Sequence, residues 1–186
     1  MRRSVWGRRQ RFPRHLLLLA GLVVLAVAAV ALLRNEPAAT PLTGRAEAVD
    51  GDTLRLGATR IRLLGLDAPE LAQDCSGAGG DWPCGAEARA FTRQVLAGHA
   101  VTCARFGRDV YGRTLARCDV DGSDLGRQIV AAGWAVSNDA YLAEQADARS
   151  AARGIWSGTF EPPAAWRRDH GAAEPGLWDW IRSWFQ

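Results

Sequence analysis

The chain has 186 residues, of which 48% are hydrophobic, and this is enough apolar material for one well-buried domain with extensions. Its formal net charge is +3, but six arginines lie before residue 16, so residues 34–186 carry 17 arginines against 20 acidic residues, a net charge of −3. This balance excludes nucleic-acid binding through a general positive field, and any such binding must come from a local cluster of charge.

The first 33 residues have the pattern of a membrane anchor. Residues 1–15 form a basic segment, and residues 16–33 follow without a charge. That length is just enough to span a bilayer as a transmembrane helix, and the arginines before it predict a cytoplasmic N-terminus. We therefore expect a membrane-anchored protein whose domain is exported to the periplasmic or extracellular side. The alternative is a cleaved signal peptide, because residues 26–28 read Ala-Val-Ala, and it predicts a secreted domain.

Residues 34–44 are predicted to form a short proline-containing linker to a domain at residues 45–170. Alternating apolar residues, turn signals and helical periodicity divide this domain into three strands, a helix, a two-stranded hairpin and two further helices. The expected strands lie at 45–49, 53–56 and 60–64 and in the hairpin at 101–120, and the helices lie at 85–96, after Asp124 and at 141–152. This order fits an α+β fold, a five-stranded Greek-key barrel of the oligonucleotide/oligosaccharide-binding (OB-fold) type with about three packed helices, although several α+β folds share it.

Residues 171–186 form a tryptophan-rich C-terminal extension in which Leu177, Ile181 and Trp184 recur at helical spacing. We favour packing of this extension against its own domain. The alternative is an amphipathic segment that lies on the outer face of the membrane.

All four cysteines lie after the predicted anchor, and an even number in an oxidising compartment predicts two disulfides, for which three pairings are possible. Cys103 and Cys118 lie symmetrically about the centre of the predicted hairpin, where they would face each other across the two strands. This leaves Cys75 and Cys84 to close a glycine-rich loop. Free thiols or a zinc site are the alternatives, and the absence of a Cys-x-x-Cys spacing argues against zinc.

Carboxylates gather at two predicted turns. Asp50 and Asp52 flank Gly51 after the first strand, and Asp67 and Glu70 follow the third. If the two turns meet, three or four carboxylates converge, and such a cluster usually holds a divalent cation. Oxygen ligands select a hard ion, Ca²⁺ or Mg²⁺.

Two arginines accompany these carboxylates. Arg62 lies on the strand that ends in Asp67, and Arg113 lies in the turn of the later hairpin. A guanidinium group grips phosphate at two points, so a metal ion, a spare carboxylate and two arginines are typical of a phosphodiesterase. Each motif by itself is more often an ordinary turn, and only the ordered set indicates this chemistry.

The motifs VDGDT, RIRLLGLDAPE, DVYGRTLA, AGWA and RGIW, in this order over residues 45–156, resemble those of the staphylococcal nuclease (thermonuclease) family. The resemblance implies the barrel fold and the Ca²⁺-dependent hydrolysis of phosphodiester bonds in DNA and RNA, leaving 3′-phosphates. It implies that Asp52, Asp67 and the backbone oxygen of Ala68 ligate calcium. In this family Ala68 often corresponds to threonine, a change that keeps the carbonyl.

The resemblance also implies roles for six further residues. Glu70 corresponds to the general base, and Arg62 and Arg113 correspond to the arginines that bind the scissile phosphate and stabilise the transition state. Residues corresponding to those that contact the bound nucleotide are Asp109, Tyr111 and Tyr141, the last in an uncertain register.

The sequence departs from the family pattern in two places. Val110 stands where a basic residue often contacts a terminal phosphate, and the loop 75–84 is an insertion beside the site that we expect to narrow access. We expect an exported monomer that binds nucleic acid and the membrane, without a protein partner. The alternatives to an enzyme are a non-catalytic binding module on the same fold and a structural envelope protein that uses the tryptophan-rich extension.

Overall fold

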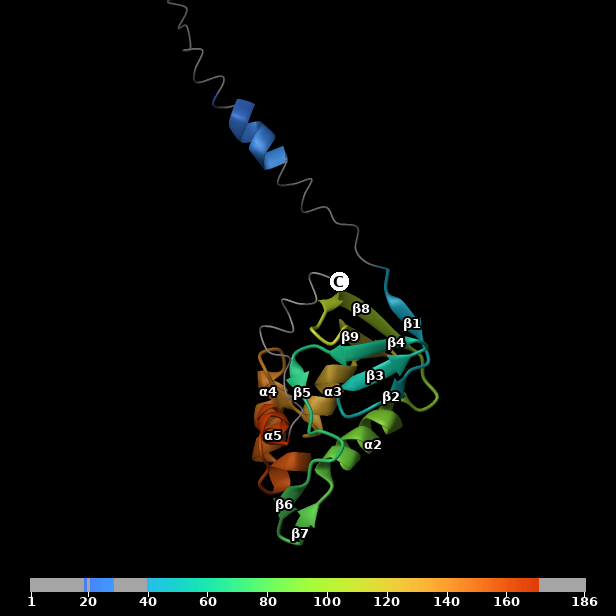
Figure 1. Ribbon diagram of the computed structural model, residues 1–186, viewed down its shortest axis with the longest axis vertical. Coiled ribbons are helices and arrows are strands. Elements are labelled where there is room, and N and C mark those ends of the chain that lie inside the picture. Colours follow the sequence, from blue (N-terminus) through green and yellow to red (C-terminus); the bar gives the residue numbers. More distant parts are fainter. Residues whose placement is uncertain (1–18, 20, 29–39, 171–186) are drawn as a thin grey trace, which may run out of the picture. The chain divides into compact units, whose positions relative to one another are not determined.

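The computed structural model describes residues 19, 21–28 and 40–170, which belong to two units divided between residues 39 and 40 (Figure 1). Residues 21–28 are helical, and within the described part of the chain no helix has both the length and the apolar character needed to cross a membrane. The predicted segment 1–15, the extension 171–186, and most of the predicted anchor 16–33 and linker 34–44 lie outside the described residues, so those assignments stay predictions.

A mixed β-sheet forms the centre of the second unit. Its strands are β1 (Leu42–Gly44), β2 (Glu47–Ala48), β3 (Thr53–Leu56), β4 (Thr59–Leu63), β8 (Val101–Arg108), β9 (Thr114–Val120) and β10 (Ser123–Asp124). They lie in the order β1-β8-β9-β4-β3-β2, with β10 beside β9. The β4–β9 pair is parallel and the other pairs are antiparallel.

The two outer strands of this order, β1 and β2, are neighbours in the chain. Residues 45–46 alone separate them, so one bent segment pairs with β8 at one end and with β3 at the other. The path of paired strands therefore returns to its beginning, as in a barrel (Figure 1). The mixed sheet and its helices confirm the predicted α+β class.

The main sheet has two strands, β1 and β10, that lie outside the five predicted strands. Residues 42–44, predicted to end the linker, instead form β1, in which Leu42 lies opposite Cys103. A three-residue strand is too short to show an alternating pattern, so the pattern alone puts the start of the domain at residue 45. The predicted strand 45–49 shrinks to β2 because residues 45–46 carry the chain from one partner strand to the other.

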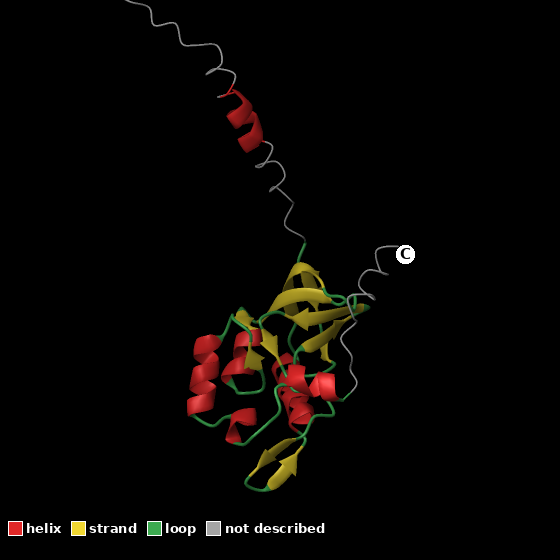
Figure 2. Cartoon of the chain, turned by 60° about the vertical axis from the view of Figure 1, so that its left-hand side comes forward, coloured by secondary structure: helices red, strands yellow, loops and turns green. Residues whose placement is uncertain are grey.

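Two short strand pairs lie outside the main sheet. β5 (Leu66–Asp67) pairs with β11 (Val136–Ser137), and β6 (Cys75–Gly77) pairs with β7 (Gly80–Trp82) within the loop that the sequence suggested as an insertion. Figure 2 shows the β6–β7 hairpin apart from the other strands.

The helices are α2 (Cys84–Leu96), α3 (Leu125–Ala131), α4 (Leu142–Ser150) and α5 (Pro163–Asp169), with a 3₁₀ turn at Gly154–Ser157. Asp124 caps α3 as predicted, since its side chain accepts a hydrogen bond of 2.8 Å from the backbone N–H of Arg127. Helix α5 was not expected from the sequence. It has seven residues, about two helical turns, and is therefore too short to show a clear helical periodicity in the sequence. Pro163 in its first turn is nevertheless typical of a helix start.

Alternating side chains of the barrel strands form the core. On β4, Ile61 and Leu63 are buried in the core while Arg60 and Arg62 lie on the opposite face of the strand, and residues such as Leu54, Val101 and Ile129 complete the main cluster. Both predicted disulfides are confirmed. Cys103 and Cys118 lie directly opposite each other with Cα atoms 4.0 Å apart, and Cys75–Cys84 closes the β6–β7 loop onto the first residue of α2.

The start of α2 lies very close to the segment that carries Glu70. The backbone N–H of Gly85 donates to the carbonyl of Gln73 at 3.0 Å, and a Cβ atom on Gly85 would lie 1.7 Å from the carbonyl oxygen of Glu70. Because the neighbour is backbone and not a flexible side chain, only glycine fits without a shift of the Glu70 segment.

We predict that Gly85→Ala lowers the free energy of unfolding by about 1–3 kcal/mol, because overpacking forces the two backbones apart. Gly79→Ala is the matched control, since a Cβ atom there has nothing within 4 Å. Urea unfolding followed by tryptophan fluorescence measures both variants. Equal stability of the two variants would show that the contact between Gly85 and Glu70 is not tight in solution.

Candidate active site

The β2–β3 turn places Asp52 in the interior. Asp50 accepts hydrogen bonds from the backbone N–H groups of Asp52 and Thr53 at 3.1 and 2.6 Å, which fixes the turn. A Cβ atom on Gly51 would lie 2.5 Å from the Cβ of Ala68, so glycine lets the turn pack against the segment after β5. Asp52 itself is only 1% exposed.

Asp52 and Asp67 are brought together by this packing, as the sequence predicted. The carboxylate of Asp52 accepts a hydrogen bond of 2.8 Å from the backbone N–H of Ala68, the residue after Asp67. Asp67 is 5% exposed and is fixed by the pairing of β5 with β11, where it lies opposite Val136. The AGWA motif therefore contributes to the site indirectly, because it leads into the strand that holds Asp67.

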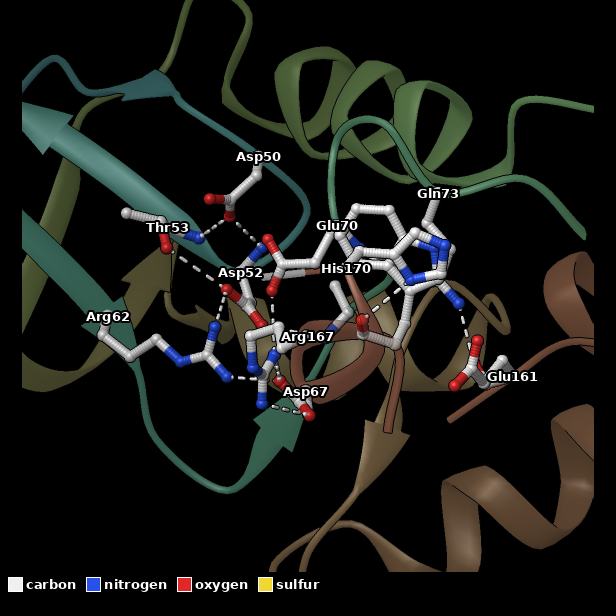
Figure 3. Close-up of polar contacts among 12 residues, drawn as sticks. Asp50, Asp52, Thr53, Arg62, Asp67, Glu70, Gln73, Glu161, Arg167 and His170 are labelled. Atoms are coloured by element: carbon white, nitrogen blue, oxygen red, sulfur yellow. Dashed lines mark hydrogen bonds and ion pairs between the residues drawn. The ribbon is translucent and has the colours of Figure 1, made fainter. Parts of the chain in front are cut away.

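Arg62 bridges the two buried carboxylates (Figure 3). One guanidinium nitrogen donates to Asp52 and the other donates to Asp67 at 2.5 Å. Burial acts to lower the pKa of Arg62, but the negative charges of Asp52 and Asp67 outweigh it, so this pKa is raised. Burial also raises the pKa of Asp52 to about 7, against the opposing attraction of Arg62, with the nearby charges of Asp50 and Asp67 adding to the rise. The buried carboxylates of Asp52 and Asp67 therefore form a site that attracts positively charged groups.

Arg167, on α5, is a residue of the site that the sequence analysis missed. It donates to both carboxylate oxygens of Asp67 at 3.0 and 3.1 Å and to Glu70 at 2.9 Å (Figure 3). Burial acts to lower its pKa, but its hydrogen bonds with Asp67 and Glu70 outweigh burial and raise it. Nothing local marks Arg167 in the sequence. The one available signal was an imbalance of charge, because the two turns contain four acids and only two arginines were predicted to accompany them.

The segment of Glu70 is tied to the chain that precedes α5. The side chain of Gln73, fully buried, accepts from the backbone N–H of Glu70 at 3.2 Å and donates to the backbone carbonyl of Glu161 at 2.7 Å (Figure 3). The side chain of Gln73 therefore ties the segment of Glu70 to the segment of Glu161, which leads into the helix that carries Arg167.

Arg113 is held from within its own hairpin turn. Its guanidinium donates to Asp109 at 2.6 Å, and the other carboxylate oxygen of Asp109 accepts from the backbone N–H groups of Tyr111 and Arg113. The guanidinium carbon of Arg113 lies 5.3 Å from the centre of the Tyr111 ring. The predicted substrate residue Asp109 therefore orients Arg113, while Tyr111 is 51% exposed.

These side chains surround an open pocket of about 630 Å³. Its charged lining consists of five arginines and a single acid, which are Arg60, Arg62, Arg108, Arg113, Arg167 and Glu70. Tyr111 also lines it, whereas none of its lining residues comes from the loop 75–84. The expectation that this loop narrows access to the site is not supported, because the loop folds as the β6–β7 hairpin and bonds with Thr159 instead.

Tyr141 does not belong to the pocket. It is 4% exposed and packs within the main core, and its hydroxyl donates to Asp124 at 3.0 Å. Burial, with this hydrogen bond, raises the pKa of Tyr141 to about 12. The predicted role of Tyr141 in substrate binding is therefore wrong, since a buried ring cannot stack on a base.

The donor atoms for a metal ion form a small set. Among the described residues no group of three or more His, Cys, Asp or Glu side chains is arranged to hold a metal ion. The metal site implied by the sequence needs only two such side chains, Asp52 and Asp67, together with the backbone oxygen of Ala68. The chemistry of these donors fits a hard cation, because they are oxygens and the two carboxylates are buried and already attract guanidinium groups.

A barrel with a cationic pocket, a pair of buried acids and a more exposed carboxylate at the pocket wall defines a phosphodiesterase of the nuclease type. The comparisons agree with this class. Residues 60–158 match the family model described as "Staphylococcal nuclease homologue", and the chain belongs to this family.

Several relatives are similar over most of the domain. The chain is 36% identical over 149 residues to "Succinoglycan biosynthesis protein ExoI" of Rhizobium meliloti (strain 1021), covering 76% of this chain and 78% of the relative. It is 35% identical over 131 residues to an "Uncharacterized endonuclease" of Escherichia coli O157:H7, covering 64% and 80%. It is 29% identical over 143 residues to "Probable endonuclease LCL3" of Colletotrichum graminicola, covering 67% and 51%.

Proposed function

We propose that this protein is an exported, calcium-dependent nuclease that hydrolyses phosphodiester bonds of DNA or RNA. The observation that carries the proposal is the pocket itself, which Arg62, Arg113, Arg167 and Glu70 line together, with Arg62 and Arg167 bonded to the buried acids beside it. A phosphodiester carries one negative charge and gains more on its oxygens as water attacks, so a pocket rich in guanidinium groups stabilises the transition state more than the ground state.

Each side chain has a distinct role in this proposal. Glu70, whose side chain is 29% exposed, lies at the pocket wall where it can accept the proton of an attacking water. Arg62 and Arg113 bind the phosphate oxygens, and Asp109 keeps Arg113 aimed at them. Asp52, Asp67 and the carbonyl of Ala68 would hold the calcium ion, which would supply further positive charge to stabilise the transition state.

The contacts of the arginines support a cation at the carboxylate pair. Arg62 and Arg167 together occupy Asp52, Asp67 and Glu70 in the free protein. With the charge of the two aspartates balanced by a bound cation, both guanidinium groups would be free to donate to phosphate, and Glu70 would be free to accept a proton. The same arginines would then balance buried acids in the free protein and phosphate in the complex.

Export is proposed on two grounds. Residues 16–33 are uncharged and follow six arginines, and all four cysteines of the domain are in disulfides. Disulfides persist in oxidising compartments, so a domain with two disulfides fits the periplasmic or extracellular side of a membrane. We propose that the N-terminal segment anchors the protein there and that the domain acts as a monomer.

Cleavage of a fluorescent single-stranded oligonucleotide by the purified full chain tests the proposal. We expect cleavage with Ca²⁺ and none with a chelator. Glu70→Gln should lower the rate by about 100-fold or more, since it removes the general base and preserves the size of the side chain. Cleavage that continues in chelator would contradict calcium dependence. Tight binding of the folded protein without cleavage at any calcium concentration would favour the non-catalytic alternative.

Arg167 offers a second test with a matched control on the same helix. We expect Arg167→Ala to lower kcat/KM by at least about tenfold, because a guanidinium group at the phosphate is lost. Arg168→Ala should remain close to wild type, since Arg168 is exposed and does not line the pocket. Arg167→Lys should recover part of the loss because it restores the charge but not the planar fork. Equal activity of the Arg167→Ala and Arg168→Ala variants would remove Arg167 from the site.

A further inference from the structure

The β8–β9 hairpin carries several exposed apolar side chains, one of which, Tyr111, lines the pocket. Within residues 40–170 the large exposed apolar side chains are Leu71, Phe106, Val110, Tyr111 and Leu142. Three of these five lie in the hairpin, and Phe106 is the most exposed of them, at 60%. Three exposed apolar side chains on one element make the hairpin a candidate contact surface.

The ladder between β8 and β9 is irregular at Phe106. Arg105 lies opposite Ala116 and Gly107 lies opposite Leu115, so Phe106 is an extra residue on β8. Gly107 has a φ of +143°, a conformation that side chains rarely adopt. This arrangement is a β-bulge, a feature that re-aims a side chain and is frequent next to active sites.

Arginines accompany the two exposed aromatic rings of the hairpin. The guanidinium carbon of Arg117 lies 5.6 Å from the centre of the Phe106 ring, as that of Arg113 lies 5.3 Å from the centre of the Tyr111 ring. Residues 105–117 contain four arginines and one acid, whereas residues 34–186 have a net charge of −3. The hairpin is therefore a local positive region with aromatic faces, which is the combination that binds single-stranded nucleic acid.

The hairpin surface is continuous with the pocket. Gly107, the residue after Phe106, lies opposite Leu115 on β9, and Leu115 in turn lies beside Arg62 on β4, which lines the pocket. A strand of nucleic acid with one phosphate among the arginines of the pocket can therefore place a neighbouring base on Phe106. In a duplex the flat faces of the bases are covered by their neighbours, so this contact requires an unpaired and unstacked base.

We propose that Phe106 and Arg117 form a stacking subsite, next to the pocket, for an unpaired base of the nucleic-acid strand that the pocket binds. The aromatic ring stacks on the base and the guanidinium contacts the adjoining phosphate. The inference rests on the proposed function of the pocket, but stacking on Phe106 requires neither a metal ion nor Glu70, so the two can be tested separately.

The test is the binding of a fluorescent single-stranded oligonucleotide, and of a duplex of the same sequence, to the full chain in chelator. Phe106→Ala should weaken single-strand binding roughly 5- to 100-fold, the range expected for the loss of one stacked base. Duplex binding should change less than about twofold. Phe106→Trp should retain single-strand affinity because it keeps an aromatic face. Leu142→Ala is the matched control, since Leu142 is 57% exposed on α4 and outside the pocket lining.

Three results would overturn the subsite. These are unchanged single-strand binding in the Phe106→Ala variant, an equal loss for single strand and duplex, and a Phe106-dependent binding to anionic lipid vesicles with oligonucleotide binding intact. Calcium-dependent cleavage that persists without any effect of Phe106 on binding would sink this inference alone. Loss of single-strand binding in the variant, with no cleavage by wild type, would instead sink the proposed nuclease function and leave the subsite standing.

Discussion

The bridge from Arg62 to Asp52 and Asp67 is the interaction on which the rest of the site depends. Two carboxylates that are almost fully buried repel each other and lose their hydration, so they can stay charged only beside positive charge. Removing one partner from a buried pair of this kind typically costs about 3–5 kcal/mol, because the other charge is left uncompensated. The fold therefore has to keep positive charge beside Asp52 and Asp67, and the surrounding elements supply or position that charge.

Elements from distant parts of the chain meet around this bridge. The β2–β3 turn provides Asp52, the β5–β11 pair fixes Asp67, and α5 supplies Arg167 as a second cation (Figure 3). The Cys75–Cys84 disulfide fixes the first residue of α2, and Gly85 at that point packs against the backbone of Glu70. The pocket is thus built on segments whose mutual positions are set by packing and cross-links. Such rigidity is what a site needs in order to stabilise charge that appears only in the transition state.

Local patterns in the sequence predicted the parts of the site that local physics determines. The Asp-Gly turn, the alternation of Arg60, Ile61, Arg62 and Leu63, and the symmetric spacing of Cys103 and Cys118 each have a short-range cause, and the structure has all three. Arg167 lies 97 residues from the Glu70 that it contacts, and no local rule links them. Tyr141 was misplaced because it lies between two matched motifs, where the register is uncertain, and a tyrosine looks the same in sequence whether its ring is exposed or, as here, packed in the core.

The most direct test of the central claim is a calorimetric titration of Ca²⁺ into the full chain and into the Asp52→Asn variant, with Asp119→Asn as a surface control and circular dichroism to check folding. If Asp52 and Asp67 form a cation site that the arginines fill in the free protein, wild type and Asp119→Asn bind one ion, and Asp52→Asn binds it at least about tenfold more weakly, since a charged oxygen ligand is lost. Equal calcium affinity in all three folded proteins would contradict it.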